Sequence, residues 1–388
     1  MGRDTSWSGE VAIVGAYESP RRKAPGVHPF QIQAECVFGA LQDAGMSLQD
    51  VDGFCSSASS PGEGAGWMDV CEVAEYLGIE PAFVDGTDTG GAAPIAQAGH
   101  AATAIAAGLA DVVVVSYAGC SYSGGSDFDT LPSTWGPWAY EAPYGFTTVA
   151  SYALAAQRHM HEFGTAPEQL AAVAVQCRAN AGPNEHARYR DPITIEDVLA
   201  SPMIASPLHR NDCCVVTDSG GAVVLVRRER AADAPRKPVW LLGFGESVGK
   251  MRTSQMTSFT ETPGVASGAR AFDMAGLRPD EMDCAQLYDS FTITVLLALE
   301  DLGFCKKGEG GPFVEAGEIA PSGSVPINTD GGGMSSNHPG RRGVFALIEA
   351  VRQLRGESPG VQLNDPKLAV AHGVGGQLSA MATMVLGV

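Results

Sequence analysis

The sequence predicts an α/β fold built from two duplicated halves, with a long region inserted between them. The segment ALQDAGMSLQDVDGF near the N-terminus resembles AFDMAGLRPDEMDCAQL much later in the chain. Aligning Gly45 with Gly276 places Asp52 on Asp283 without a gap, and self-similarity of this kind indicates a repeated structural unit. The predicted strands are short, continuous apolar runs rather than alternating ones, which is typical of a sheet covered by helices on both faces.

Each copy of the repeat reads as an amphipathic helix, a polar turn and an apolar strand. The helix ends at Gly45 in the first copy and at Gly276 in the second. Glycine suits a helix C-cap because a positive φ costs it little. Strands at 11–15 and 239–245 would open the two halves.

A second pair of segments strengthens the duplication. In the first half Gly90 and Gly91 precede an Ala-rich helix that runs to about Gly108, and a strand follows at 111–117. The second half repeats this order with Gly331, Gly332 and Gly333, a helix at about 342–355 and a strand at 368–372.

We therefore predict an N-terminal half at 1–120, a C-terminal half at 235–388 and an inserted loop and helical region at 121–234. The insert contains predicted helices at 149–162 and 167–180 and returns to the first sheet with a strand at 221–226. Long segments of this kind either shape a binding site or oligomer contact, or are surface elaboration.

Composition excludes several classes of protein. The 388 residues carry 25 Lys+Arg against 44 Asp+Glu, a net charge of −19, which argues against nucleic-acid binding because that rests on neutralising phosphates. The apolar stretch 101–119 is interrupted by Asp111 and changes from helix-like to strand-like, so no membrane span is expected. The nine cysteines show no metal-ligand spacing, so we expect no metal, no cofactor and a reducing cytoplasmic location.

Two motifs are similar to those of the thiolase superfamily: the run NTDGGGMSSNHPG at 328–340 and HGVGG at 372–376. The segment YDSF followed by LEDLGFC, within 288–305, resembles the sterol-carrier and lipid-transfer-protein branch, some members of which are retro-aldolases that shorten steroid side chains. The resemblance implies a five-layered αβαβα fold, a tight homodimer and an acyl-CoA substrate in lipid metabolism.

Thiolases of the thiol-using kind carry a nucleophilic Cys just before the Gly-rich turn of the first half, where a helix N-terminus favours the thiolate. Here that stretch contains Thr87 and Thr89 but no Cys, and a Thr hydroxyl without an adjacent base is a poor nucleophile. The second catalytic Cys is also absent, since the matching C-terminal segment offers only His372 as a titratable side chain.

The remaining polar residues favour proton transfer. By resemblance, Tyr288 stands where relatives carry an oxyanion-shaping Asn or His, and His338 stands in the His-Pro element that contributes to thioester binding. His372 would complete a ring of one Tyr and two His. These residues suit retro-aldol cleavage of a β-hydroxyacyl-CoA to a carbonyl compound and a shortened acyl-CoA. Aldolase-type relatives carry a second Tyr near the position of His338, and this chain departs from that pattern.

Two further groups are candidates for substrate contacts. The turn formed by Gly331, Gly332, Gly333 and Asn337 would bring backbone N–H groups to the thioester oxygen as an oxyanion hole. Arg341 and Arg342, at a predicted helix start, would bind the phosphates of CoA. Asp289, next to Tyr288, is expected to be a structural hydrogen-bond acceptor on the opposite face.

Three functions remain open at the level of sequence. They are a carbon–carbon lyase acting on a β-hydroxyacyl-CoA, a thiolase-type acyltransferase that cleaves a 3-oxoacyl-CoA with CoA, and a non-catalytic acyl-CoA-binding subunit. The resemblance also implies a separate small OB-fold, zinc-ribbon protein as a partner in a heterotetramer.

Overall fold

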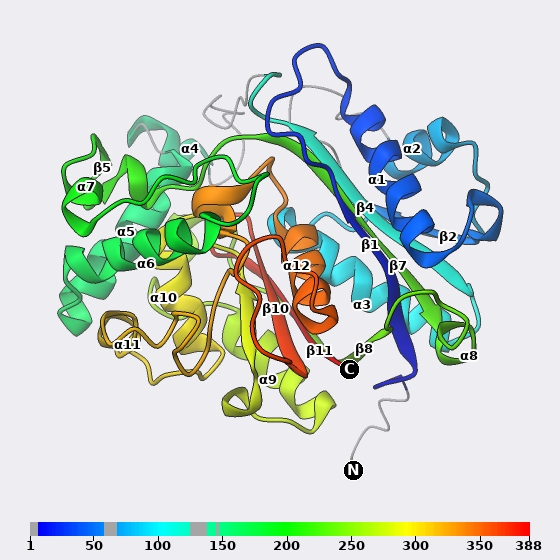
Figure 1. Cartoon of the computed structure of the whole chain (residues 1–388). Coiled ribbons are helices and arrows are strands. Elements are labelled where there is room, and N and C mark those ends of the chain that lie inside the picture. The colour runs from blue at the N-terminus through cyan, green and yellow to red at the C-terminus, as the bar shows by residue number, and fades with distance from the viewer. Residues whose placement is uncertain (1–6, 58–67, 125–137, 145–146) are drawn as a thin grey trace.

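The strands form a central sheet in the order β3-β2-β4-β7-β1-β8-β11-β10-β9 (Figure 1). The computed structural model describes residues 7–57, 68–124, 138–144 and 147–388. The strands of this sheet are β1 (Val11–Glu18), β2 (Gly53–Ser56), β3 (Phe83–Asp85), β4 (Val112–Cys120), β7 (Asp218–Arg227), β8 (Val239–Val248), β9 (Cys284–Leu287), β10 (Leu368–Gly375) and β11 (Ala380–Gly387). The first five strands in this order come from the first half and the insert, and the last four come from the second half.

The two halves of the sheet join through a short antiparallel contact between β1 and β8, in which Ala12 pairs with Trp240 and Ile13 with Val239. Helices α3 (Ala93–Ala106) and α12 (Gly343–Arg355) lie between the two halves and contact strands of both (Figure 1). Helices α1 (Pro29–Ala44) and α2 (Asp69–Leu77) cover one outer face, and α9 (Gly264–Ala275) and α10 (Thr292–Asp301) cover the other. The order of layers is αβαβα, which confirms the predicted five-layered fold.

The duplicated aspartates have the same structural role. Asp52 accepts hydrogen bonds from the backbone N–H of Asp111 and Val112, at 2.9 and 2.8 Å, where β4 begins. Asp283 accepts from Lys367 and Leu368, at 2.7 and 2.9 Å, where β10 begins. Each carboxylate thus ties the start of one strand to the start of its parallel neighbour, so the two residues that align in sequence are equivalent in structure.

The paired glycines also match. Gly45 ends α1 with φ 68°, and Gly276 ends α9 with φ 67°. In each half a strand glycine lies directly under the helix, and a side chain at Gly15 or Gly243 would overlap the helix backbone. Both copies therefore pack the helix onto the sheet by the same close approach.

The insert places helices α5 (Thr148–Phe163), α6 (Pro167–Ala181) and α7 (Ile195–Leu199) beside a small hairpin of β5 (Met203–Ala205) and β6 (Leu208–His209). It returns as β7, which pairs with β4 and β1. Residues 125–137 and 145–146 of the insert lie outside the described residues. The sequence did not predict α2, β3, β11 or the hairpin, each of which is short or lacks a distinctive pattern. No helix in the described part of the chain is long and apolar enough to cross a membrane.

Candidate active site

Tyr288 directly follows β9, and its position is set by the neighbouring strand. Its backbone N–H donates to the carbonyl of His372 in β10, at 2.9 Å. Its ring lies against the turn that opens α3, where a side chain at Gly91 would overlap the ring. Tyr288 is only 5% exposed. Because its ring contacts Gly91 of the first half, the phenol lies where the two halves meet, beside the N-terminus of α3.

His338 reaches the same place from a different segment. It follows a π-helical turn, Gly332–Ser336, and its N–H donates to Thr217 Oγ1 at 2.9 Å. Its Nε2 lies 2.9 Å from the Tyr288 hydroxyl, which also donates to the carbonyl of Gly340 at 2.6 Å. The two rings meet edge to face, with centroids 5.5 Å apart. The structure therefore brings two of the three predicted catalytic side chains into direct contact.

Burial determines the protonation states of Tyr288 and His338. Desolvation, helped by the nearby Arg342 charge, lowers the pKa of His338 to about 4. Desolvation also raises the pKa of Tyr288 well above its usual value of 10. At neutral pH the pair is a neutral imidazole and a protonated phenol. With the phenol proton directed at Gly340, the phenol oxygen accepts from Nε2–H of His338, and Nδ1 is left as the basic nitrogen.

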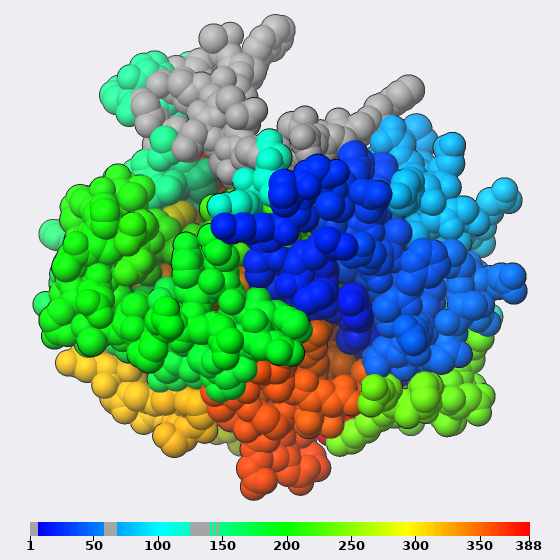
Figure 2. All heavy atoms as spheres, turned by 45° about the horizontal axis from the view of Figure 1, so that its top comes forward, coloured from blue at the N-terminus to red at the C-terminus, as the bar shows by residue number. Residues whose placement is uncertain are grey.

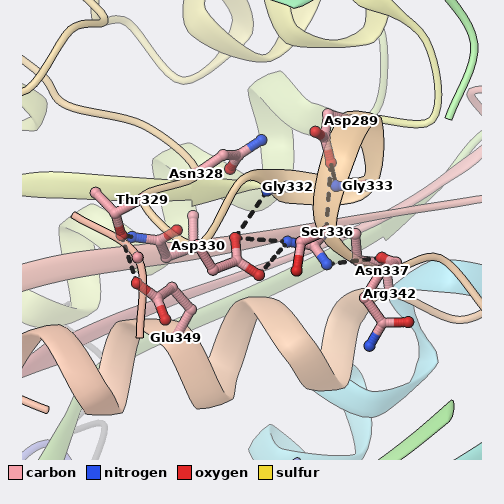
Figure 3. Close-up of polar contacts among 12 residues, drawn as sticks. Asp289, Asn328, Thr329, Asp330, Gly332, Gly333, Ser336, Asn337, Arg342 and Glu349 are labelled. Atoms are coloured by element: carbon pink, nitrogen blue, oxygen red, sulfur yellow. Dashed lines mark hydrogen bonds and ion pairs between the residues drawn. The ribbon is translucent and has the colours of Figure 1, made fainter. Parts of the chain in front are cut away.

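The turn that carries His338 is held by Asp289, the residue after Tyr288 (Figure 3). The Asp289 carboxylate accepts from the N–H of Gly333 at 2.7 Å and of Met334 at 3.1 Å. It is fully buried, and desolvation raises its pKa to about 6, although the neighbouring Arg342 charge and these N–H groups oppose the rise. Asp289 thus links the two segments that supply Tyr288 and His338, and the prediction that it is a structural acceptor is confirmed.

Arg342, the residue before α12, completes this clamp (Figure 3). One of its nitrogens contacts both carboxylate oxygens of Asp330 at 2.9 Å, and another donates to the carbonyl of Asn337 at 2.8 Å. Arg342 is 2% exposed, and its Nε lies 3.3 Å from Asp289. A guanidinium enclosed by two carboxylates is not available to a phosphate, so the prediction that Arg342 binds CoA is wrong.

The Gly-rich turn is not the predicted oxyanion hole. The N–H of Gly331 donates to the carbonyl of Asn328, and that of Gly332 donates to Asp330. Since Gly333 donates to Asp289, the N–H groups of all three glycines already have acceptors inside the protein. The turn needs its glycines for another reason, because Gly331 and Gly332 adopt φ of 102° and 66°.

The two other predicted substrate contacts are also engaged with the protein. Asn337 is fully buried; its amide donates to Glu18 at 3.0 Å and accepts from Thr217 at 2.8 Å. Arg341 forms an ion pair with Asp88 at 2.6 Å, and its side chain is 12% exposed.

His372 contacts Tyr288 through its backbone carbonyl, but its side chain bonds elsewhere. Its Nδ1 lies 2.9 Å from the hydroxyl of Thr383, which lies 2.9 Å from the hydroxyl of Ser267 in α9. Burial lowers the pKa of His372 to about 4. The imidazole is a buried, neutral group whose Nδ1 bonds on the α9 side of the sheet, and the predicted ring of three side chains does not form among the described contacts.

The sequence did not predict that a cysteine thiol would lie near Tyr288. Cys214 is close enough to Tyr288 and Tyr152 to act electrostatically on both. Burial raises the pKa of Cys214, so it is a thiol rather than a thiolate. Tyr152, from α5, donates to the carbonyl of Gly376 at 3.1 Å and packs on Phe291. Nothing in the adjacent pair Cys213-Cys214 could have indicated this position, because it depends on how the insert folds back onto the segment after β9.

Comparison with known proteins gives concordant results. Residues 245–388 match the family model described as "Thiolase C-terminal domain-like". A steroid side-chain-cleaving aldolase of Thermomonospora curvata is 35% identical over 368 residues, covering 90% of this chain and 91% of the relative. An acetyl-CoA acetyltransferase of Methanothermobacter thermautotrophicus is 31% identical and covers 95% and 96%. The solved Ltp2-ChsH2(DUF35) aldolase superposes with a TM-score of 0.89 at 32% identity, covering 99% of both chains.

Proposed function

The chain belongs to the thiolase superfamily, in the branch that contains the steroid side-chain-cleaving aldolases, and we propose that it cleaves a β-hydroxyacyl-CoA by a retro-aldol reaction. The products are a ketone or aldehyde and a shortened acyl-CoA. The observation that carries this proposal is the hydrogen-bonded pair of Tyr288 and His338, which contains an acid and a base but no thiolate.

The proton transfers follow from the pair's protonation. Nδ1 of neutral His338 accepts the proton of the substrate's β-hydroxyl, the Cα–Cβ bond breaks, and its electrons form the thioester enolate. Tyr288 then donates its proton to Cα. The proton on Nε2 of the imidazolium crosses the 2.9 Å contact to restore the phenol, and exchange with water restores the starting tautomer. General acid–base help of this kind is worth about 10²- to 10⁴-fold in rate.

The enolate oxygen needs hydrogen-bond donors, and the turn at Gly331–Gly333 cannot supply them. The ring of Tyr288 lies against Gly91, in the turn that opens α3. A helix N-terminus has N–H groups without an intrahelical acceptor and a partial positive charge. At the start of α3 the N–H groups of Gly90 and Ala93 already have acceptors and Pro94 has no N–H. We therefore assign the stabilisation of the enolate to the N–H of Gly91 and to the positive end of α3, the place where a thiol-using thiolase would carry its nucleophile.

The decisive experiment uses a 3-hydroxyacyl-CoA and no free CoA. Release of a carbonyl product, lost in Tyr288→Phe and in His338→Ala, supports the lyase. A rate that both substitutions leave unchanged would contradict the roles assigned here. A protein that binds acyl-CoA but converts no 3-hydroxyacyl- or 3-oxoacyl-CoA would be the non-catalytic subunit.

An acyltransferase is the second candidate, because the Methanothermobacter thermautotrophicus relative is an acetyltransferase and Cys214 lies near Tyr288. It requires a thiolate, whereas burial keeps Cys214 protonated. Cleavage of a 3-oxoacyl-CoA that depends strictly on free CoA and is abolished by thiol alkylation would favour it over the lyase.

The acyl group is proposed to be a steroid side chain, on the basis of the aldolase relative from Thermomonospora curvata. A partner protein is proposed because the solved aldolase is a pair, Ltp2 with ChsH2(DUF35). We expect the partner to be a small OB-fold, zinc-ribbon protein that binds acyl-CoA. Full activity of the chain alone on steroid thioesters would argue against it. The free state of all nine cysteines is consistent with the proposed cytoplasmic location.

A homodimer is proposed through the sheet edge at β3. Among the described residues this strand has a neighbour on one side only, and Val84 in it is 47% exposed. An unpaired edge is a template for pairing with a second chain, and Val84 and Leu109, which is 62% exposed, both line a hollow of about 380 Å³ beside it. Val84→Lys should yield a monomer in analytical ultracentrifugation, and an unchanged dimer would place the interface elsewhere.

A further inference from the structure

The carboxylate of Glu18 joins the two halves of the molecule. Glu18 is the last residue of β1, in the first half, and its side chain is only 7% exposed. It accepts from Arg22 at 2.7 Å, from Arg352 of α12 at 2.7 Å and from the side-chain amide of Asn337 at 3.0 Å. Figure 2 shows the same convergence at the surface, where blue residues of the first half lie beside orange residues of the second half.

The charge of this carboxylate determines how the Asn337 side chain is turned. Burial opposes ionisation of Glu18, but the charges of Arg22 and Arg352 outweigh it and hold its pKa at about 2. An ionised carboxylate only accepts hydrogen bonds, so Asn337 must direct its N–H₂ group at Glu18. The amide oxygen of Asn337 therefore points away from Glu18.

The hydroxyl of Thr217 continues this chain of hydrogen bonds to His338. Its Oγ1 donates to Asn337 Oδ1 at 2.8 Å and accepts from the backbone N–H of His338 at 2.9 Å. A hydroxyl has one proton, so donating it to Asn337 leaves the oxygen to accept from His338. The charge of Glu18 thus sets the direction of every hydrogen bond in the chain.

A second connection from Glu18 runs through Arg22. The Nη2 of Arg22 donates to Glu18, and its Nε donates to the carbonyl of Ser336 at 3.0 Å. Glu18 therefore holds both residues that precede His338, since it contacts Asn337 directly and Ser336 through Arg22. A residue of the first half in this way fixes the backbone from which the imidazole extends.

We propose that Glu18 is a positioning residue for His338. It acts through Asn337 and Thr217 on the backbone from which the imidazole reaches the Tyr288 hydroxyl. Asn337 and Thr217 are fully buried, so these side chains affect the reaction through His338 and not by contact with the substrate. The inference rests on the proposed lyase reaction, in which His338 is the base, and a misplacement of about 1 Å in such a group can cost about 10²-fold in rate.

Two variants of Thr217 test the hydrogen bond nearest to His338. Thr217→Val keeps the shape of the side chain and removes the hydroxyl, so kcat should fall about tenfold or more while KM for a 3-hydroxyacyl-CoA stays within about twofold. Thr217→Ser keeps the hydroxyl and should retain kcat within about threefold. A role in packing alone would give the reverse order, because the serine variant loses the methyl group and the valine variant does not.

Glu18→Gln tests the charged end of the chain. The new amide can turn either face toward Asn337 and no longer dictates its orientation, so kcat per folded molecule should fall about tenfold with KM unchanged. The double variant Glu18→Gln/Thr217→Val should lose about as much as the more affected single variant, because both changes act through the same hydrogen bonds. Independent effects would instead multiply.

Asp301→Asn is the control for loss of a buried, ion-paired carboxylate. Asp301 pairs with Lys307 and accepts from the backbone N–H of Thr262, and its side chain is fully buried. This variant should lower the free energy of unfolding and leave kcat per folded molecule unchanged. If Glu18→Gln does not fold, Asn337→Leu breaks the chain at its middle, leaves Glu18 with its two arginines and should show the same loss of kcat.

NMR spectra of the His338 imidazole separate this inference from the proposed reaction. In protein labelled with isotope-enriched histidine, the signal that is absent from His338→Gln should show a proton on Nε2, hydrogen-bonded to Tyr288. Thr217→Val and Glu18→Gln should shift or broaden this signal, and Asp301→Asn should not. A wild type that converts no 3-hydroxyacyl-CoA would refute the proposed function, while the spectra would still test the positioning. An unchanged His338 signal, an unchanged kcat in Thr217→Val or in Glu18→Gln, or losses that multiply in the double variant would each overturn the proposal.

Discussion

The Tyr288 hydroxyl and His338 Nε2 lie 2.9 Å apart, although the two residues belong to different segments of the second half. Two backbone features bring them together. Tyr288 is aligned by the carbonyl of His372 in the neighbouring strand, and His338 is positioned by Thr217, which comes from the insert. The pair is therefore assembled by the whole fold, and its separation depends on groups that do not touch the substrate.

Removing either member of the pair should reduce turnover without unfolding the protein. We expect Tyr288→Phe and His338→Gln each to lower kcat about 10²-fold or more, since each removes one proton-transfer group. Tyr76→Phe, at a tyrosine that is 51% exposed, is the matched control and should leave kcat unchanged. The measurement is carbonyl release from a 3-hydroxyacyl-CoA under saturation, and a fall in Tyr76→Phe equal to that in Tyr288→Phe would remove the assignment.

The pH profile should show a base with a low pKa. His338 must be neutral to accept a proton, and burial lowers its pKa from 6.5 to about 4. Activity is thus retained as pH falls through 6.5 and is lost only as it approaches 4. Tyr288, with a pKa raised above 10, stays protonated throughout the neutral range. A profile of kcat/KM against pH, with circular dichroism to confirm folding at each pH, checks this; an acid limb near pH 6.5 would contradict it.

Replacing Asp289 should damage both stability and catalysis. In Asp289→Asn the amide presents an N–H₂ group to one of the two N–H donors, Gly333 or Met334, and leaves Arg342 short of a countercharge. Breaking such a buried, charged network costs about 3–5 kcal/mol, and a displaced His338 should lower kcat by a further factor of about ten.

Asp52→Asn is the matched control for this change. Asp52 also accepts two backbone N–H groups, but it does so at the start of β4 in the first half. It should lower the unfolding free energy and leave kcat per folded molecule unchanged. If Asp289→Asn affected only stability, as Asp52→Asn should, Asp289 would have no role in positioning the pair.

Sequence alone was sufficient for the fold because the duplication is encoded by local signals. Gly45 and Gly276 mark helix ends, and Asp52 and Asp283 mark strand starts, in the same order in both halves. Tyr288 and His338 could be selected from motifs as candidates for proton transfer, but their surroundings could not be predicted. The Gly331–Gly333 turn reads as a free oxyanion hole until Asp289, 44 residues before Gly333, is seen to accept from the N–H of Gly333, and this pairing depends on tertiary contacts.

His372 should control acid stability rather than catalysis. Its pKa is about 4 in the folded protein, against about 6.5 when unfolded. Between pH 7 and pH 5 the unfolded chain therefore gains a proton that the folded chain does not, and stability falls with pH by roughly 2 kcal/mol. His372→Gln should lose this dependence, as measured by urea unfolding at both pH values, with kcat within a few-fold of wild type. A large loss of kcat in a well-folded His372→Gln would restore His372 to the catalytic set.

Replacing Cys214 is the clearest way to distinguish a proton-transfer mechanism from acyl transfer. Because burial keeps its thiol protonated beside Tyr288, Cys214→Ser should retain the lyase rate within a few-fold. Cys71→Ser, at an exposed cysteine of α2, controls for general effects of thiol removal. Intact-protein mass spectrometry during turnover should find no acyl group on the wild type. An adduct that appears on the wild type and disappears in Cys214→Ser, together with loss of activity, would establish a covalent intermediate and exclude the mechanism proposed here.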